Sequence, residues 1–233
     1  MSRMSYEQTG VAMTCRSYDE YVRMFDLKDA DLRNGEVLDV AAGGSSFTAE
    51  ANGRGIPAMA VDPRYEGNAA LWISEAAREI DDSTKKLAKI AQVFDWSYYG
   101  TLEKHREGRE ASLRRFEADA SGNFGLHRYV AGRLPELPFD DNRFSLLLCS
   151  HFMFLYAGQF GPDFHLQSVI ELMRICRPGG QIRIYPLISL NWEPYPELDA
   201  LLEAVRANGG KPELLPTRLP FIPESDYFLQ ISL

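Results

Sequence analysis

The sequence has few of the features that mark secreted, metal-binding or membrane proteins. Its three cysteines, Cys15, Cys149 and Cys176, are far apart and form none of the close pairs typical of zinc sites or disulfide frameworks. No apolar run approaches the roughly 20 residues that a membrane-spanning helix needs. The first residues also lack the apolar core of a signal peptide. These absences predict a cytoplasmic protein with no metal site and no membrane partner.

The chain also lacks an excess of basic residues. Its 25 Lys and Arg against 33 Asp and Glu give a net charge of −8. Nucleic acids are bound mainly through clustered Lys and Arg, so this balance disfavours a nucleic-acid partner. It favours a small-molecule or protein partner instead. With 45% hydrophobic and 25% charged residues, the composition is that of a globular protein, and 233 residues fit one domain, residues 1–233.

Strand-like and helix-like segments alternate along the chain, which is typical of an α/β protein. The expected strands are residues 36–41, 57–62, 127–131, 144–149, 181–185, 213–219 and 227–233. The last two are joined by a Pro-rich loop that is too short for a crossover helix, so they should pair antiparallel. We therefore expect a mainly parallel sheet that ends in a hairpin.

The first strand runs into a turn of small residues. Residues 37–47 read Val-Leu-Asp-Val-Ala-Ala-Gly-Gly-Ser-Ser-Phe, a buried strand followed by five small side chains and the start of a helix. Such a turn brings backbone N–H groups and a helix N-terminus close to a bound ligand. The second strand ends on Asp62, 23 positions after Asp39, where an acid suits ribose hydroxyls. Both features predict a nucleotide-type cofactor, but the absence of Gly-x-Gly-x-x-Gly disfavours an NAD-linked oxidoreductase.

Two segments lie outside the regular alternation. In residues 1–34, Ser17 and Glu20 form a capping-box pattern for a helix that either packs on the sheet or is a lid over the cofactor. Residues 64–125 are too long for one crossover and follow the carboxyl end of a strand, where ligands bind. We expect them to form a helical cap on the substrate side of the cleft. Two helices are predicted at residues 68–80 and 83–98. The charge-balanced stretch 101–118 is typical of a solvated helix face, with a binding surface as the alternative.

Taken together, these motifs resemble class I S-adenosylmethionine-dependent methyltransferases over nearly the whole chain. The similar segments are residues 37–46, 61–63, 132–144 and 175–184, in the family's order. The resemblance implies a Rossmann-like, doubly wound α/β sheet of seven strands, mostly parallel, with the last strand antiparallel and inserted beside the fifth. It also implies S-adenosyl-L-methionine as the cofactor.

The resemblance assigns specific residues to the cofactor site. By position they are Asp39, Ala41, Ala42, Gly43, Ser45, Asp62, Pro63, Arg133, Leu134 and Ser150. Two of them depart from the family pattern. Ala41 stands where the family usually has its first glycine, and Arg133 stands where many members carry an acid for the adenine amino group. Arginine has donors only, so it cannot accept that hydrogen bond, although its guanidinium can stack on the adenine.

Methyl transfer by in-line displacement needs mainly proximity and alignment, and a base only when the nucleophile arrives protonated. The reacting groups should follow the fourth strand, where His151 is the candidate base because it titrates near neutrality. Alternatively, His151 only bonds the cofactor or the loop. Tyr156 and Trp192 are candidate contacts for a small or medium acceptor, and His105 has no partner that suggests chemistry. A non-catalytic binding or interaction module on the same fold, with Ala41 and Arg133 marking a decayed site, is the other hypothesis.

Overall fold

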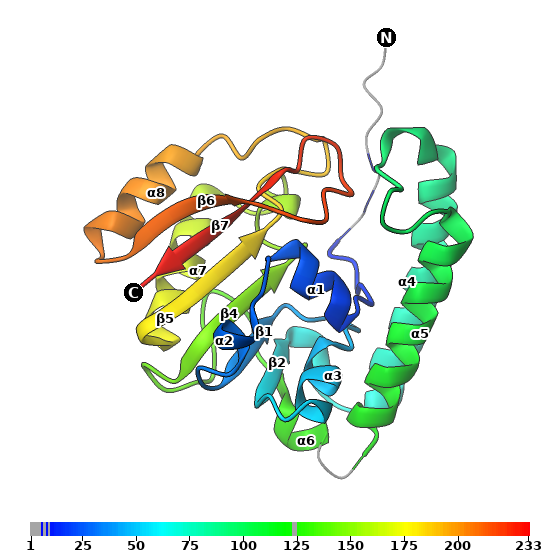
Figure 1. Cartoon of the computed structure of the whole chain (residues 1–233), viewed down its shortest axis with the longest axis horizontal. Helices are drawn as coiled ribbons and strands as arrows, with labels where there is room; N and C mark the ends of the chain where they lie inside the picture. Colours follow the sequence, from blue (N-terminus) through cyan, green and yellow to red (C-terminus); the bar gives the residue numbers. More distant parts are fainter. Residues whose placement is uncertain (1–5, 7, 9, 123–124) are drawn as a thin grey trace.

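The computed structural model describes residues 6, 8, 10–122 and 125–233, and its elements are labelled in Figure 1. The helices are α1 (Tyr18–Met24), α2 (Asp29–Leu32), α3 (Phe47–Gly53), α4 (Ala69–Lys89), α5 (Leu102–Ala120), α6 (Gly125–Arg128), α7 (Pro162–Ile175) and α8 (Leu198–Ala207). Short 3₁₀ turns lie at Pro63–Tyr65, Ala91–Val93 and Phe154–Tyr156. The strands are β1 (Val37–Val40), β2 (Ala58–Asp62), β3 (Tyr129–Ala131), β4 (Phe144–Ser150), β5 (Cys176–Tyr185), β6 (Lys211–Pro216) and β7 (Tyr227–Ser232).

The strands of the described residues form one seven-stranded sheet in the order β3-β2-β1-β4-β5-β7-β6. The pairs from β3 to β5 are parallel, and β7 is antiparallel to both of its neighbours. The predicted Rossmann-like, doubly wound sheet with its last strand inserted antiparallel beside the fifth is therefore confirmed. This is the strand arrangement that the resemblance to class I methyltransferases implies.

Helices cover both faces of the sheet, which explains why its central strands read as continuous apolar runs. Every residue of β1 and β4 is buried. On one face, Val169 and Leu172 of α7 pack with Val205 of α8. On the other face, Tyr21 of α1 packs with Phe47 of α3, and their rings stack 4.6 Å apart between centroids. The core is therefore divided into two layers by the sheet.

Three boundaries differ from the sequence prediction. The helices expected at residues 68–80 and 83–98 are one helix up to Lys89, because Asp81, Asp82 and Ser83 are polar but do not break a helix as Gly or Pro would. Strand β3 is shorter than expected, since residues 127 and 128 belong to α6. Strand β5 begins before the expected residue 181, at Cys176. The predicted helical region 64–125 is thus mainly a hairpin of α4 and α5 beside the sheet (Figure 1).

The segment before α1 lies over the turn that follows β1. The backbone N–H of Gly44 donates to the Thr14 carbonyl at 3.0 Å, and the N–H of Ser46 donates to the Arg16 carbonyl at 3.0 Å. In Figure 1 this segment passes between the sheet and the α4–α5 hairpin. The predicted capping box of α1 is confirmed, with Ser17 and Glu20 each bonding the other's backbone N–H. Of the predicted lid, residues 1–5, 7 and 9 lie outside the described residues.

We expect Gly44→Ala to destabilise the protein by about 1–3 kcal/mol, the usual cost of overpacking a filled core. A Cβ at this position would lie 2.8 Å from the Cys15 sulfur and 3.1 Å from the Ala76 Cβ, and both neighbours are buried. Urea unfolding measures the loss. Gly53→Ala is the matched control, because nothing lies within 4 Å of its added Cβ. Equal stability of the two variants would show that residues 13–16 do not pack tightly on the turn.

Candidate functional site

A first cavity of about 330 Å³ lies at the carboxyl ends of β1 and β2. Open α/β sheets bind their ligands at this edge, and the volume is within the range of small-molecule sites. Five of the ten residues predicted to hold the cofactor line it, namely Ala41, Asp62, Pro63, Arg133 and Leu134. The sequence motifs that follow β1, β2 and β3 therefore meet at one cavity.

Asp62 joins the ends of the two strands at this cavity. Its carboxylate accepts the N–H of Gly43 at 3.1 Å and the N–H of Arg64 at 2.9 Å. The side chain is buried, and burial raises the pKa of Asp62 although these N–H groups act in the opposite direction. A hydrogen-bonded acid is thus held at the cavity wall, where it can accept hydroxyl donors of a ligand.

Much of the remaining lining of the first cavity is apolar or aromatic. Leu134 and Phe152 line it together with Phe160 and Phe164, whose rings stack 4.4 Å apart. Gly132 completes this wall, because a Cβ there would lie 2.7 Å from Val61 and 2.8 Å from Pro138. A buried acid and flat apolar side chains in one cavity match the two parts of a nucleoside, a sugar and a base.

The other five predicted cofactor residues do not line the first cavity. Asp39, Ala42, Gly43, Ser45 and Ser150 are all buried. Helix α1 and the segment before it cover them. The Asp39 carboxylate accepts the Tyr21 hydroxyl at 2.9 Å, and burial raises the pKa of Asp39 to about 8. The Ser45 hydroxyl donates to the Arg16 carbonyl at 3.0 Å. These contacts fill the place predicted for the methionine end of a cofactor.

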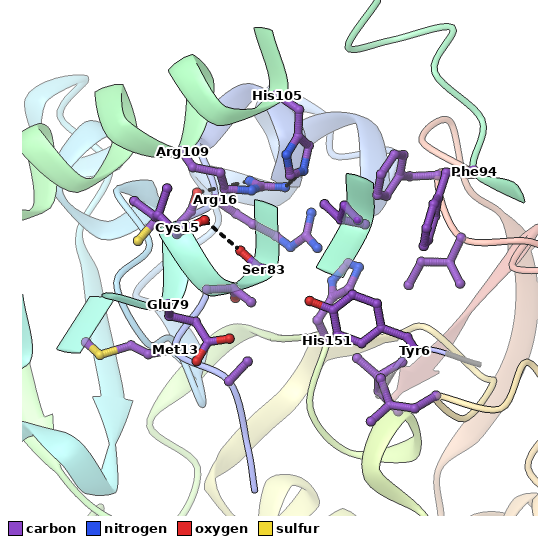
Figure 2. Close-up of a pocket in the computed structure, with 18 of the residues that line it drawn as sticks. Tyr6, Met13, Cys15, Arg16, Glu79, Ser83, Phe94, His105, Arg109 and His151 are labelled. Atoms are coloured by element: carbon purple, nitrogen blue, oxygen red, sulfur yellow. Dashed lines mark hydrogen bonds between the residues drawn. The ribbon is translucent and has the colours of Figure 1, made fainter. Parts of the chain in front are cut away.

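A second cavity, with about 100 Å³ of free space, is lined in part by this N-terminal segment (Figure 2). Val11 lines the first cavity, whereas residues 12–16 line the second. The structure brings together here the three residues predicted to contact the acceptor, His151, Tyr156 and Trp192. Side chains of α4 and α5 complete the wall. The two cavities are thus neighbours, divided by a strip of the chain's own N-terminal segment.

The environment of His151 differs from the expected near-neutral titration. Its Nδ1 lies 3.0 Å from the Ser150 hydroxyl, which leaves Nε2 as the ring nitrogen available to a ligand. Burial, together with the positive charges of Arg16 and Arg109, lowers the pKa of His151 well below its usual value. The direction of this shift runs against a base that titrates near pH 7, and the role of His151 stays a prediction. Tyr156 is also engaged, because its hydroxyl accepts the N–H of Ala12 at 2.9 Å.

A buried charge cluster beside the second cavity was not predicted. The Glu20 carboxylate accepts Nη1 of Arg109 at 2.7 Å, Nη1 of Arg16 at 3.3 Å and the Tyr99 hydroxyl at 2.6 Å. Nη2 of Arg109 lies 3.1 Å from Nε2 of His105. The stretch expected to be a solvated helix face therefore buries part of its charge. A sequence signal does exist, because residues 105, 109, 112 and 116 of α5 repeat at helical spacing and all are buried.

A search of family models finds no match. The chain is 32% identical over 193 residues to uncharacterised protein MJ0045 of Methanocaldococcus jannaschii, covering 82% of this chain and 85% of that protein. The chain belongs to the MJ0045 family. Among solved structures, it is similar to a TehB-like SAM-dependent methyltransferase from Corynebacterium glutamicum, with 13% identity, a TM-score of 0.49 and coverage of 91% of this chain and 86% of that one. It is also similar to a SAM-dependent methyltransferase from Aquifex aeolicus, with 15% identity, a TM-score of 0.43 and coverage of 91% and 90%.

Three further findings concern the described part of this MJ0045-family chain. It contains no group of three or more His, Cys, Asp or Glu side chains placed to hold a metal ion. None of its helices combines the length and the apolar character that crossing a membrane requires. Cys15, Cys149 and Cys176 are all buried and free.

Proposed function

We propose that the protein binds S-adenosyl-L-methionine in the first cavity and transfers its methyl group to a small or medium acceptor in the second. The observation that carries this proposal is the first cavity itself, which is lined by Asp62 and by the aromatic rings of Phe152, Phe160 and Phe164. It lies at the ligand-binding edge of a sheet with the methyltransferase strand order. A second cavity, lined by His151, directly adjoins it.

The residues present fit the adenosine end of the cofactor. Asp62 would accept the ribose hydroxyls, Arg133 would stack on the adenine, and Leu134 and Phe152 would cover it. Asp39 fits the methionine ammonium, because its Oδ2 is buried without a partner among the described residues. Residues 13–16 now cover that end, so we propose that cofactor binding displaces them.

The cofactor supplies a methyl group on a sulfonium: the acceptor's lone pair bonds the methyl carbon, and the electrons of the broken carbon–sulfur bond stay on sulfur. The chain's contribution is to align the two ligands in direct contact, once the N-terminal segment between the two cavities has been displaced. His151 would receive a proton at Nε2 where the acceptor carries one. Tyr156 and Trp192 would contact the acceptor.

The two segments outside the sheet take their proposed roles from this arrangement. Residues 10–34 include the strip between the cavities and α1, so we propose that they are a lid. The α4–α5 hairpin carries Glu79, Ser83, His105 and Arg109 into the second cavity. We propose that the insertion, residues 64–125, is a cap over the acceptor, apart from residues 123–124, which lie outside the described residues.

A non-catalytic binding module is the second candidate function. It is favoured by the hydrogen bonds of Gly44 and Ser46 to the chain's own carbonyls, because these N–H groups would otherwise face a cofactor. Incubation with S-adenosylmethionine labelled at the methyl carbon and a cell extract separates the two candidates. Label transferred to any acceptor supports catalysis, whereas cofactor binding with no transfer supports the binding module.

We expect Asp62→Ala to weaken binding of S-adenosylhomocysteine at least tenfold, because the variant loses the acceptor of the ribose hydroxyls. Isothermal titration calorimetry measures the dissociation constant, and a thermal scan confirms that the variant folds. Glu213→Ala, an exposed acid on the edge strand β6, is the control and should bind like the wild type. Folded wild-type protein that binds no cofactor at millimolar concentration would refute the proposed function.

A further inference from the structure

The second cavity has more buried positive than negative charge on its α5 side. Arg16 is 7% exposed and Arg109 is 6% exposed, yet only one carboxylate, that of the 2% exposed Glu20, pairs with them. Both arginines line the cavity. Buried charges are normally balanced, because an unpaired charge in a low-dielectric interior is costly. One buried positive charge is therefore left for a ligand to neutralise.

Two hydrogen-bond donors at the same place have no acceptor. Nε of Arg16 and Nδ1 of His105 are buried without a partner among the described residues. Burial, reinforced by Arg109, lowers the pKa of His105 to about 2, so its ring is neutral. Since Nε2 accepts the Arg109 N–H, the ring proton is on Nδ1. Native proteins rarely leave buried donors unpaired, and both of these belong to residues that line one cavity.

From this charge and these donors we infer that the acceptor carries a compact anionic group, a carboxylate or a phosphate, which Arg16 and Arg109 bind. The inference rests on the proposed function in one respect, that the second cavity holds the acceptor. Figure 2 shows the Arg16 side chain reaching between His105 and His151. An anion bound there lies between the charge cluster and the candidate base.

The remainder of the cavity determines what the anion is attached to. Much of it is apolar, and it includes aromatic rings, with Phe94 and Phe221 stacked 4.8 Å apart and Trp192 edge-on to Phe94 at 6.2 Å. Aromatic walls favour a flat, apolar body. The free space of about 100 Å³ is well below the roughly 300 Å³ of a drug-sized site, so the body is small. The acceptor is therefore a small aromatic acid or aryl phosphate.

Glu79 sets the orientation of this ligand. It contributes the one carboxylate among the described residues that line the cavity, and it comes from α4, whereas Arg109 and His105 come from α5. Figure 2 shows its carboxylate away from the Arg16 side chain. An anion near Glu79 would be repelled, so the anionic group is directed to the α5 side.

An anion in this position also changes His151. After burial, the charges of Arg16 and Arg109 are what hold the pKa of His151 low. A bound carboxylate offsets those charges and raises that pKa, which makes the imidazole a better proton acceptor. Binding of the acceptor thus raises the proton affinity of its candidate base, His151.

The test compares matched pairs of ring compounds. Benzoate, phenylacetate and phenyl phosphate are titrated calorimetrically against benzamide and phenylacetamide with cofactor-free wild-type protein, in which residues 13–16 hold Arg16 at the second cavity. We expect at least one anion to bind tenfold or more tightly than the amides, and the carboxylates and the phosphate together show which anion fits. Equal or weaker binding of every anion would overturn the inference, and this comparison needs no variant.

Variants then locate the anion. Arg16→Met keeps the apolar stem and should lose at least tenfold in anion affinity while its affinity for the amides is unchanged, and Arg16→Lys should recover part of the loss. Arg106→Met, on the exposed side of α5, is the control. Unchanged anion affinity in folded Arg16→Met would overturn the assignment. S-adenosylhomocysteine titrated alone tests the proposed function separately: its failure with anion selectivity intact refutes the cofactor and leaves the anion site.

Discussion

Replacing Glu20 by glutamine lowers the free energy of unfolding by about 3–5 kcal/mol, the usual cost of breaking a buried ion pair from one side. The Glu20 carboxylate is 2% exposed and accepts Arg109 at 2.7 Å, Arg16 at 3.3 Å and Tyr99 at 2.6 Å. Glutamine has the same shape, but it leaves two buried guanidinium groups without a counter-charge and turns one acceptor into a donor that faces donors. Guanidinium chloride unfolding at pH 7 measures the loss.

Two further variants separate the buried charge from a general effect of the substitution. Glu110→Gln removes an exposed carboxylate that pairs with Arg106 at 2.8 Å, and it should cost less than about 1 kcal/mol. Adding Arg109→Met to Glu20→Gln should restore part of the stability, because it removes one of the unpaired charges. A loss below about 1 kcal/mol for Glu20→Gln itself would mean that solvent, and not this carboxylate, balances the cluster.

The difference in stability between the wild type and Glu20→Gln should become smaller as the pH falls. Burial alone would raise the pKa of Glu20, but the charges of Arg109 and Arg16 and the hydrogen bonds to Ser17 and Tyr99 overcome it and hold that pKa at about 2. A carboxylate with a lowered folded pKa stabilises the protein above its unfolded pKa of roughly 4.3, and this stabilisation is lost as the pH falls towards 2. Wild type and Glu20→Gln should therefore converge in stability below about pH 4.

The first cavity was predictable from the sequence because its determinants are local. The small residues 41–46 must follow a buried strand, and Asp62 must end the next one, so parallel pairing alone brings them to the same edge of the sheet. Arg133 and Leu134 follow β3 in the same way. Each of these statements needs only the strand boundaries, which hydrophobic patterning gives to within two or three residues.

The second cavity depends on contacts that no local pattern contains. Glu20 and Arg109 are 89 positions apart, yet they form the main buried ion pair. A charge-balanced helix such as α5 has the same composition whether its charges face water or meet a partner on another element. The displaced pKa of His151 has the same origin, because it follows from burial and from Arg16 and Arg109, which reach it only in the folded chain. Contacts between residues so far apart in the sequence are set by tertiary packing, so sequence periodicity cannot predict them.

The N-terminal segment connects the two cavities physically. Its backbone carbonyls at Thr14 and Arg16 bond the turn after β1, the Arg16 side chain reaches the second cavity, and Tyr21 of α1 bonds Asp39. On the proposed function, a cofactor that displaces residues 13–16 therefore also moves Arg16. Binding of cofactor and acceptor would then be coupled, and each ligand would change the affinity of the other by the same factor.

Asp39 is expected to destabilise the free protein as the pH rises, and Asp39→Asn should remove that effect. The carboxyl is 0% exposed and accepts the Tyr21 hydroxyl at 2.9 Å. Burial raises the pKa of Asp39 to about 8 in the folded protein, whereas an unfolded Asp titrates near 3.9. Between these values the folded state binds more protons than the unfolded state, so wild-type stability falls with increasing pH.

We expect Asp39→Asn to become more stable relative to the wild type as the pH rises. Because asparagine does not titrate, the difference in free energy of unfolding should change in its favour by about 5 kcal/mol from pH 4 to pH 8. Urea unfolding at pH 4, 6 and 8 measures it, with Asp140→Asn as the exposed control. Parallel curves for wild type and Asp39→Asn would show that the buried carboxyl does not take up a proton on folding. On the proposed function, the stabilised variant binds S-adenosylhomocysteine more weakly, because it has lost the charge that faces the methionine ammonium.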